Sequence, residues 1–149
     1  MAKFKVGDEL DKLMESFGNM AYDAPAIGKG CVYEAAKVML DGIRENINRL
    51  DDVTEAEREG MLNGLGVTKI ENRNGSISNS ISFDGYNSYV TKKYPKGHAN
   101  VMIARAIEHG VAWEKQDKFI QRAVKRYRES AVQAVEQVLE KEIKKRIEV

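Results

Sequence analysis

Apolar residues recur every three or four positions over Lys29 to Leu50, and this spacing predicts an amphipathic helix. A shorter stretch with the same spacing predicts a first helix from about Glu9 to Gly18, for which Asp8 is the N-cap. Between these helices, Asn19 to Gly30 contains Pro25 and two glycines, which are residues typical of turns. We therefore expect a loop there.

The last part of the chain has the longest helical pattern. It predicts a helix from about Asp117 to Ile147, which is about 45 Å long at the helical rise per residue. A compact chain of this length is about 30 Å across. The helix therefore either overhangs its own subunit and packs on another molecule, or crosses the whole sheet and leaves its charged end in solvent. Its apolar stripe consists of Phe119, Ile120, Ala123, Val124, Tyr127, Ala131, Val132, Val135, Val138, Leu139 and Ile143.

The middle of the chain alternates between apolar and polar residues, as strands do. Asn74-Gly75 favours a type I′ turn, which predicts a hairpin in which Arg73 pairs with Ser76. In this register one face joins the core, and the other is either solvated or meets a neighbouring subunit or lines a lumen. The core face consists of Thr68, Ile70, Ile77, Ile81 and Phe83, and the serine-rich face of Lys69, Glu71, Ser76, Ser78, Ser80 and Ser82.

Two shorter segments flank the hairpin. Thr54 and Glu57 have the spacing of a capping box and predict a single short helical turn. Three glycines after this turn are expected to loosen the backbone; they are Gly60, Gly64 and Gly66. On the other side of the hairpin, Tyr86 to Val90 is predicted to add a third strand.

These elements predict an α+β fold in one domain spanning residues 1–149. A small antiparallel sheet is centred on the Asn74-Gly75 hairpin and is packed by two or three helices, including the long C-terminal helix. Only that helix and the one over Lys29 to Leu50 have apolar faces large enough to cover the sheet, so we expect both on its core face.

Charge and composition narrow the range of functions. The chain has 24 Lys and Arg and 23 Asp and Glu, a net charge of +1, so there is no bulk field to attract nucleic acid or a membrane, and we expect neither partner. No apolar run reaches the roughly 20 residues that span a bilayer, and the N-terminus lacks the pattern of a signal peptide. The single cysteine, Cys31, lies in an apolar helical stripe, which favours a buried residue over a reactive thiol. These features indicate a cytosolic chain.

The candidates for catalysis are few. Glu108 and His109 are adjacent on a predicted helix, so their side chains point about 100° apart and cannot act together on one atom. With His98 they are too few and wrongly spaced for a metal site. His109 suits the negative end of a helix, and Gly110 suits the residue after it. We expect no enzymatic activity, no cofactor and no metal.

The segment that contains Glu108 carries a further pattern. A helical turn of small apolar residues closes on Glu108 and Gly110, a polar link follows, and Phe119 begins the long helix. This order resembles the tail-completion proteins (head–tail joining, neck or tail-terminator proteins) of tailed bacteriophages and phage-tail-like particles. The matching positions are Ala104, Ile107, Glu108, Gly110, Phe119 and Ala123. The family often has Thr, Pro and Pro where this chain has Val111, Lys118 and Arg122.

The resemblance implies a structural protein that forms a ring, a collar or terminator of six copies, at the head-proximal end of a phage tail or tail-like bacteriocin. Its partners would be further copies of itself and tail-tube, sheath or connector proteins. It would be assembled in the bacterial host cytoplasm and reside in the tail. The alternative function is a small cytosolic adaptor or regulatory module that binds a protein.

In a ring, one contact patch is expected on the outer face of the long helix and the other on the link around Trp113 or on the sheet. The candidate subunit-interface residues are Trp113, Tyr127, Val138, Leu139 and Ile143. Trp113 could equally anchor its link to the core. Three lysines form a basic loop, which is either a solvated turn or a contact with an acidic partner; they are Lys92, Lys93 and Lys96.

Overall fold

The structure of the protein, a computed structural model, describes residues 24–74 and 76–147 and has the expected α+β class. The predicted helix from Glu9 to Gly18 lies outside the described residues. In chain order the elements are α2 (Ala24–Asn48), α3 (Glu55–Gly64), β1 (Leu65–Val67), β2 (Glu71–Arg73), β3 (Ser76–Ser78), β4 (Ile81–Phe83), α4 (Asn100–His109) and α5 (Phe119–Ile147).

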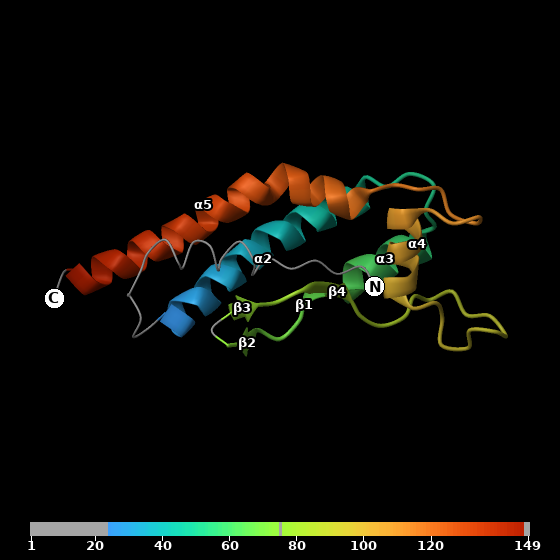
Figure 1. The fold of residues 1–149 in the computed structure, drawn as a ribbon. Helices are drawn as coiled ribbons and strands as arrows, with labels where there is room; N and C mark the ends of the chain where they lie inside the picture. Colours follow the sequence, from blue (N-terminus) through green and yellow to red (C-terminus); the bar gives the residue numbers. More distant parts are fainter. Residues whose placement is uncertain (1–23, 75, 148–149) are drawn as a thin grey trace.

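Helices α2 and α5 lie side by side and run in opposite directions along the length of the molecule (Figure 1). Each buries much of the apolar stripe predicted from its sequence, although five residues of the α5 stripe are only partly buried: Val124, Tyr127, Val132, Val138 and Ile143. The buried positions of α2 are Ile27, Cys31, Val32, Ala35, Ala36, Met39, Ile43 and Ile47, and those of α5 are Phe119, Ile120, Ala123, Ala131, Val135 and Leu139. The core is therefore mainly a helix–helix interface, widened by the strands and by α3 and α4.

The start of α2 differs from the prediction. The helix begins at Ala24, so the expected loop up to Gly30 is wrong in its last part. Pro25 lies in the first turn, where a missing N–H leaves no helical hydrogen bond unmade. Gly28 faces Ile77 so closely that a side chain would clash there, and Gly30 faces α5 at an ordinary packing distance, so both glycines lie within a packed helix and not in a turn.

Because α2 begins this early, it is long enough to lie along most of α5. By residue number α5 is about 44 Å long and α2 about 38 Å. Most of α5 is therefore covered within the subunit, and only its last turns extend beyond the start of α2 (Figure 1). Neither of the two expected arrangements, a large overhang or a helix that crosses the sheet, describes α5. It packs lengthwise against α2.

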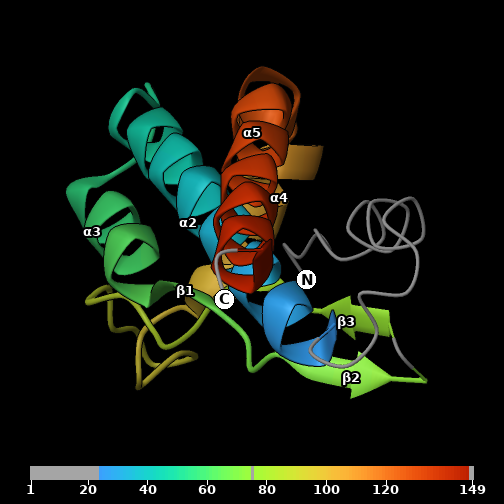
Figure 2. The same ribbon diagram turned by 90° about the vertical axis from the view of Figure 1, so that its left-hand side faces the viewer.

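Helix α3 lies on the opposite side of α2 from α5 (Figure 2). The predicted capping box is confirmed: Glu57 N donates to Thr54 Oγ1 at 3.2 Å, and Thr54 N donates to Glu57 Oε1 at 2.9 Å. The helix continues to Gly64, so the single turn was too short. Arg58 then donates to the carbonyls of Ile47 and Leu50 at 2.5 and 2.7 Å, which satisfies the end of α2.

The hairpin register is confirmed, because β2 and β3 are antiparallel with Arg73 opposite Ser76. The strands do not form one sheet, however. After β3 the chain continues into β4, which pairs with β1 in a separate two-stranded sheet, with Leu65 opposite Phe83. The predicted third strand over Tyr86 to Val90 is wrong, since Tyr86 makes only an isolated bridge with Ala99.

The predicted faces of the hairpin are partly correct. Ile77, Ile81 and Phe83 are buried as expected, but so is Ser82, because β4 lies against helices α3 and α4 as well as β1. The other serines are half-buried, so the serine face is not simply solvated surface. The helices that cover the strands are chiefly α2 and α4; α5 contributes Phe119, whose ring meets Phe83 edge-on at 6.4 Å between centroids.

Candidate functional site at the α4–α5 junction

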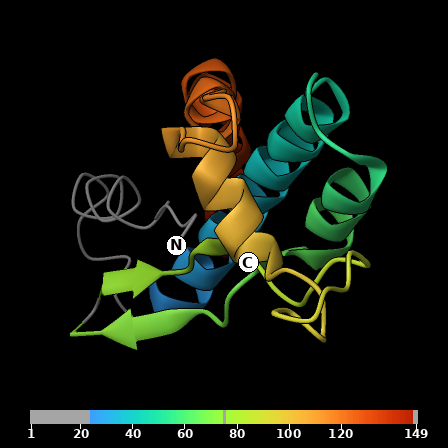
Figure 3. The same ribbon diagram turned by 90° about the vertical axis from the view of Figure 1, so that its right-hand side faces the viewer.

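The candidate site is the end of the molecule where α4 and the link of residues 110–118 lead into α5 (Figure 3). The six positions of the family pattern converge here. Four of them are buried and hold the two helices against the core: Ala104, Ile107, Phe119 and Ala123. Gly110 closes α4 with a φ of 76°, and its N–H donates to Ala106 O at 2.8 Å. A residue with a side chain would be strained at this φ.

The sixth position, Glu108, has a role that sequence reasoning missed. One oxygen of its carboxylate accepts from Ile120 N at 2.9 Å and the other from Gln121 N at 3.0 Å. The first turn of α5 contains no acidic residue, so Glu108 supplies the cap and the negative charge from another helix. The sequence contains no signal for this cap, because Asp117 lies at the predicted start of the helix, whereas in the structure it pairs with Arg122.

Further hydrogen bonds attach this junction to its neighbours. Asn46 Nδ2 on α2 donates to the Phe119 carbonyl at 2.9 Å, and Asn46 is itself buried. Asp117 N donates to Ile107 O at 2.8 Å, which returns the link to α4. The start of α5 is thus positioned from α2 and α4 by directional contacts.

A pair of carboxyl groups joins the link to α3. Glu114 hydrogen-bonds Glu57, the capping-box residue of α3. Burial, this hydrogen bond and the negative charge of Glu57 raise the pKa of Glu114 to about 7. Burial also disfavours the charged form of Glu57, but the hydrogen bonds from Glu114 and Thr54 outweigh it and lower the pKa of Glu57. Below about pH 7 these shifts favour a state in which Glu114 carries the shared proton and donates it to the Glu57 carboxylate.

The side chains that were the candidates for chemistry lie in different environments. Both oxygens of Glu108 accept backbone hydrogen bonds, and His109 is exposed beside it. Among the residues that the structure describes, no three His, Cys, Asp or Glu side chains could hold a metal ion. Cys31 is fully buried, and burial, with Glu142 adding to it, raises the pKa of its thiol to about 11, which keeps it protonated.

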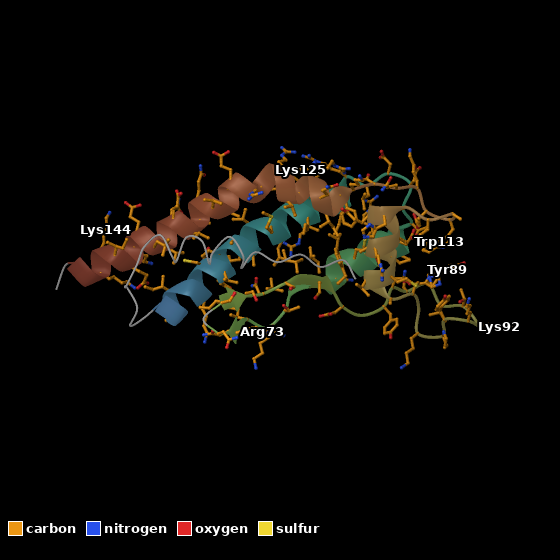
Figure 4. The ribbon with its side chains drawn as sticks, viewed as in Figure 1. Arg73, Tyr89, Lys92, Trp113, Lys125 and Lys144 are labelled. Atoms are coloured by element: carbon orange, nitrogen blue, oxygen red, sulfur yellow. The ribbon has the colours of Figure 1, made fainter. Side chains whose placement is uncertain are left out.

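The candidate interface residues lie in different environments. Trp113 projects from the tip of a turn closed by Val111 and Glu114 and is 60% exposed, so it does not anchor the link to the core (Figure 4). Tyr127 donates a hydrogen bond to Glu45 on α2. The remaining three are partly or fully covered within the subunit: Val138, Leu139 and Ile143. Trp113 is thus the one of the five that is mostly open to a partner.

Comparison of the chain with protein-family models, with curated proteins and with solved structures gives no match. In residues 24–74 and 76–147, no helix is long and apolar enough to cross a membrane.

Proposed function

We propose that the protein is a structural component of a phage tail or tail-like particle and forms a closed ring that completes the head-proximal end of the tube. The observation that carries this proposal is the convergence of the six family-pattern residues at one junction, where Glu108 of α4 caps α5. These residues resemble tail-completion proteins in sequence order, and the junction gives each of them a physical reason to be there.

The link beside this junction offers a surface for contact between copies. Trp113 and Val111 are exposed on it, and large exposed apolar side chains often mark protein interfaces. A second patch elsewhere on the subunit would meet this link head-to-tail, and repetition around a circle closes the ring. The sixfold number comes from the family resemblance. Helix α2 covers the apolar stripe of α5, so the surface of α5 that is left for such contacts is its polar outer face and its last turns.

The ring is tested by native mass measurement of the wild-type protein and of Trp113→Ser. We expect a closed oligomer for the wild type and mainly monomers for the variant, because the variant loses the exposed indole without disturbing a buried residue. Lys115→Ser, at the exposed neighbouring position, is the matched control and should keep the ring.

Purified tails from cells that make the variant provide the second measurement. We expect tails of irregular length, or tails that fail to join a head, when Trp113→Ser replaces the wild type. A wild-type protein that stays monomeric at high concentration and is absent from purified tails would contradict the proposal and favour the adaptor function.

A further inference from the structure

The near-zero net charge of the chain conceals a strong separation of charge. Residues 85–128 contain ten Lys and Arg and three Asp and Glu, a net charge of +7. The rest of the chain contains 14 Lys and Arg and 20 Asp and Glu, a net charge of −6. A total charge says nothing about such local fields, so the expectation that nucleic acid is not a partner loses its basis.

The acidic groups within this basic segment are all used internally. Glu108 caps α5, Glu114 hydrogen-bonds Glu57, and Asp117 pairs with Arg122. All ten basic residues, in contrast, are exposed. Of these cations, Arg122 pairs with Asp117 and Lys115 with Asp52, but the segment as a whole keeps its positive net charge.

The part of this segment between β4 and α4, residues 85–99, forms a loop with a dense internal network. Asn87 is buried, and its side-chain oxygen accepts from Tyr89 N at 3.1 Å and from His98 N at 3.0 Å. Thr91 Oγ1 accepts from Tyr94 N at 3.0 Å. The His98 ring meets the rings of Tyr89 and Tyr94 edge-on, at 5.4 and 4.4 Å between centroids, respectively. The loop thus has a defined shape despite the lack of regular strands.

This ordered loop exposes aromatic and basic side chains together at one end of the molecule (Figure 4). Tyr86 and Tyr89 are each 59% exposed. Three exposed lysines follow, none of which has an ion-pair partner among the described residues: Lys92, Lys93 and Lys96. We name residues 85–99 the tyrosine–lysine loop.

We propose that the tyrosine–lysine loop binds single-stranded nucleic acid. The lysines contact backbone phosphates, and Tyr86 and Tyr89 stack on unpaired bases, which is the combination that sequence-tolerant binding of single strands requires. An acidic protein surface suits this loop less well, because lysine is depleted in protein interfaces. The loop also lowers the entropic cost of binding, since the ring of Tyr89 already packs edge-on against His98 before the ligand arrives.

This binding is independent of the proposed ring, which uses the Trp113 link. The tyrosine–lysine loop and the Trp113 link both lie at the α4 end of the molecule. Nucleic acid bound by neighbouring copies would therefore lie near the contacts between copies. Neither function requires the other. The test therefore measures the oligomeric state of every sample alongside binding.

Binding is measured by fluorescence anisotropy of a labelled oligothymidylate, about 20 nucleotides long, titrated with the full chain over a range of salt concentrations. We expect affinity to fall as salt rises, because phosphate contacts release counterions. Lys92→Ala/Lys93→Ala/Lys96→Ala should weaken binding by about tenfold or more and flatten the salt dependence. Tyr86→Ala/Tyr89→Ala should weaken binding by about tenfold with little change in the salt dependence.

The matched control removes the same number of charges from the far end of α5, at Lys141, Lys144 and Lys145 (Figure 4). Replacing these three with alanine should leave binding within about twofold, since they lie far from the loop. Circular dichroism of each variant checks that the fold is kept. The loop hydrogen bonds come from Asn87, Thr91 and the backbone, which none of these changes removes.

Three results would overturn the proposal. The first is no binding at low salt, and the second is equal loss in the distal control, which would show a nonspecific charge effect. The third is binding of polyglutamate as tight as that of the oligonucleotide with no effect of the tyrosine changes, which would indicate an acidic protein partner. If the protein binds the oligonucleotide but stays monomeric, the proposed nucleic-acid binding is supported and the proposed ring is contradicted.

Discussion

The two ends of the α2–α5 pair are held together by different kinds of contact. At the α4 end, Glu108 caps the first turn of α5, and Asn46 donates to the carbonyl of Phe119. At the far end, Val135 and Leu139 pack against α2 through apolar side chains. The charged residues there pair along the exposed surface of their own helix, as Lys144 does with Glu140 at 4.0 Å.

This difference has a physical consequence. Hydrogen bonds to backbone groups at a helix terminus are directional, so they determine where α5 begins and at which angle it leaves the link. Apolar packing is not directional and tolerates the substitution of one apolar side chain by another of similar volume. Exposed ion pairs contribute little. The α4 end should therefore be sensitive to single polar changes, and the far end should not.

The largest effect should come from Phe119→Ala, because Phe119 is fully buried at the point where α2, β4 and α5 meet. We expect a loss of about 3 to 5 kcal/mol in the free energy of unfolding, measured by chemical denaturation. Ile143→Ala, at a half-buried position near the far end, should cost about 1 kcal/mol. The difference follows from burial, and equal losses at the two positions would contradict the central place of Phe119 in the core.

A smaller effect is expected from Glu108→Ala. The change leaves Ile120 N and Gln121 N without their acceptor, which should lower the free energy of unfolding by about 1 to 2 kcal/mol. The control is Glu140→Ala, which removes one exposed carboxylate from the far end of α5 and should cost at most about 0.5 kcal/mol. Denaturation curves that shift equally for both variants would show that Glu108 is not a cap.

The smallest effect should be a pH-dependent loosening of the link. The pKa of Glu114 is raised to about 7 in the folded protein from the ordinary 4.5. The shared proton therefore adds stability that is fully present below about pH 4.5 and is lost as the pH rises through about 7. Above that pH, Glu57 and Glu114 are both charged and repel each other.

Trp113 adjoins Glu114 and is the single tryptophan of the chain, so its fluorescence reports on the link. We expect a transition centred near pH 7 in the wild type and none in Glu114→Gln, whose amide donates to Glu57 at every pH. A transition that persists unchanged in Glu114→Gln would have to come from another group and would remove the carboxyl pair from the α4 end.

Elements with local signals were predictable from the sequence. The apolar period predicted α5 to within two residues at its start, because a helix repeats the same geometry along its length. The Asn74-Gly75 turn predicted the pairing of Arg73 with Ser76, since a two-residue turn leaves one register. The capping box at Thr54 was equally local.

The tertiary structure decided what depends on distant neighbours. Pro25 and the glycines near the start of α2 have the composition of a turn, yet α5 and β3 cover this segment and it is helical. Ser82 is polar, but helices on the far side of β4 bury it.

The candidate site shows the same division. Its residues could be picked out from their order along the chain, but the sequence left open whether Trp113 anchors its link to the core, and only the structure shows that it is exposed. The cap from Glu108 to α5 and the shared proton of Glu57 and Glu114 were not predicted. Both join groups that local spacing does not bring together, because residues 110–118 separate Glu108 from α5 and the four strands and α4 separate Glu57 from Glu114. Only the packing of α3 and α4 around the link places these groups within hydrogen-bonding distance.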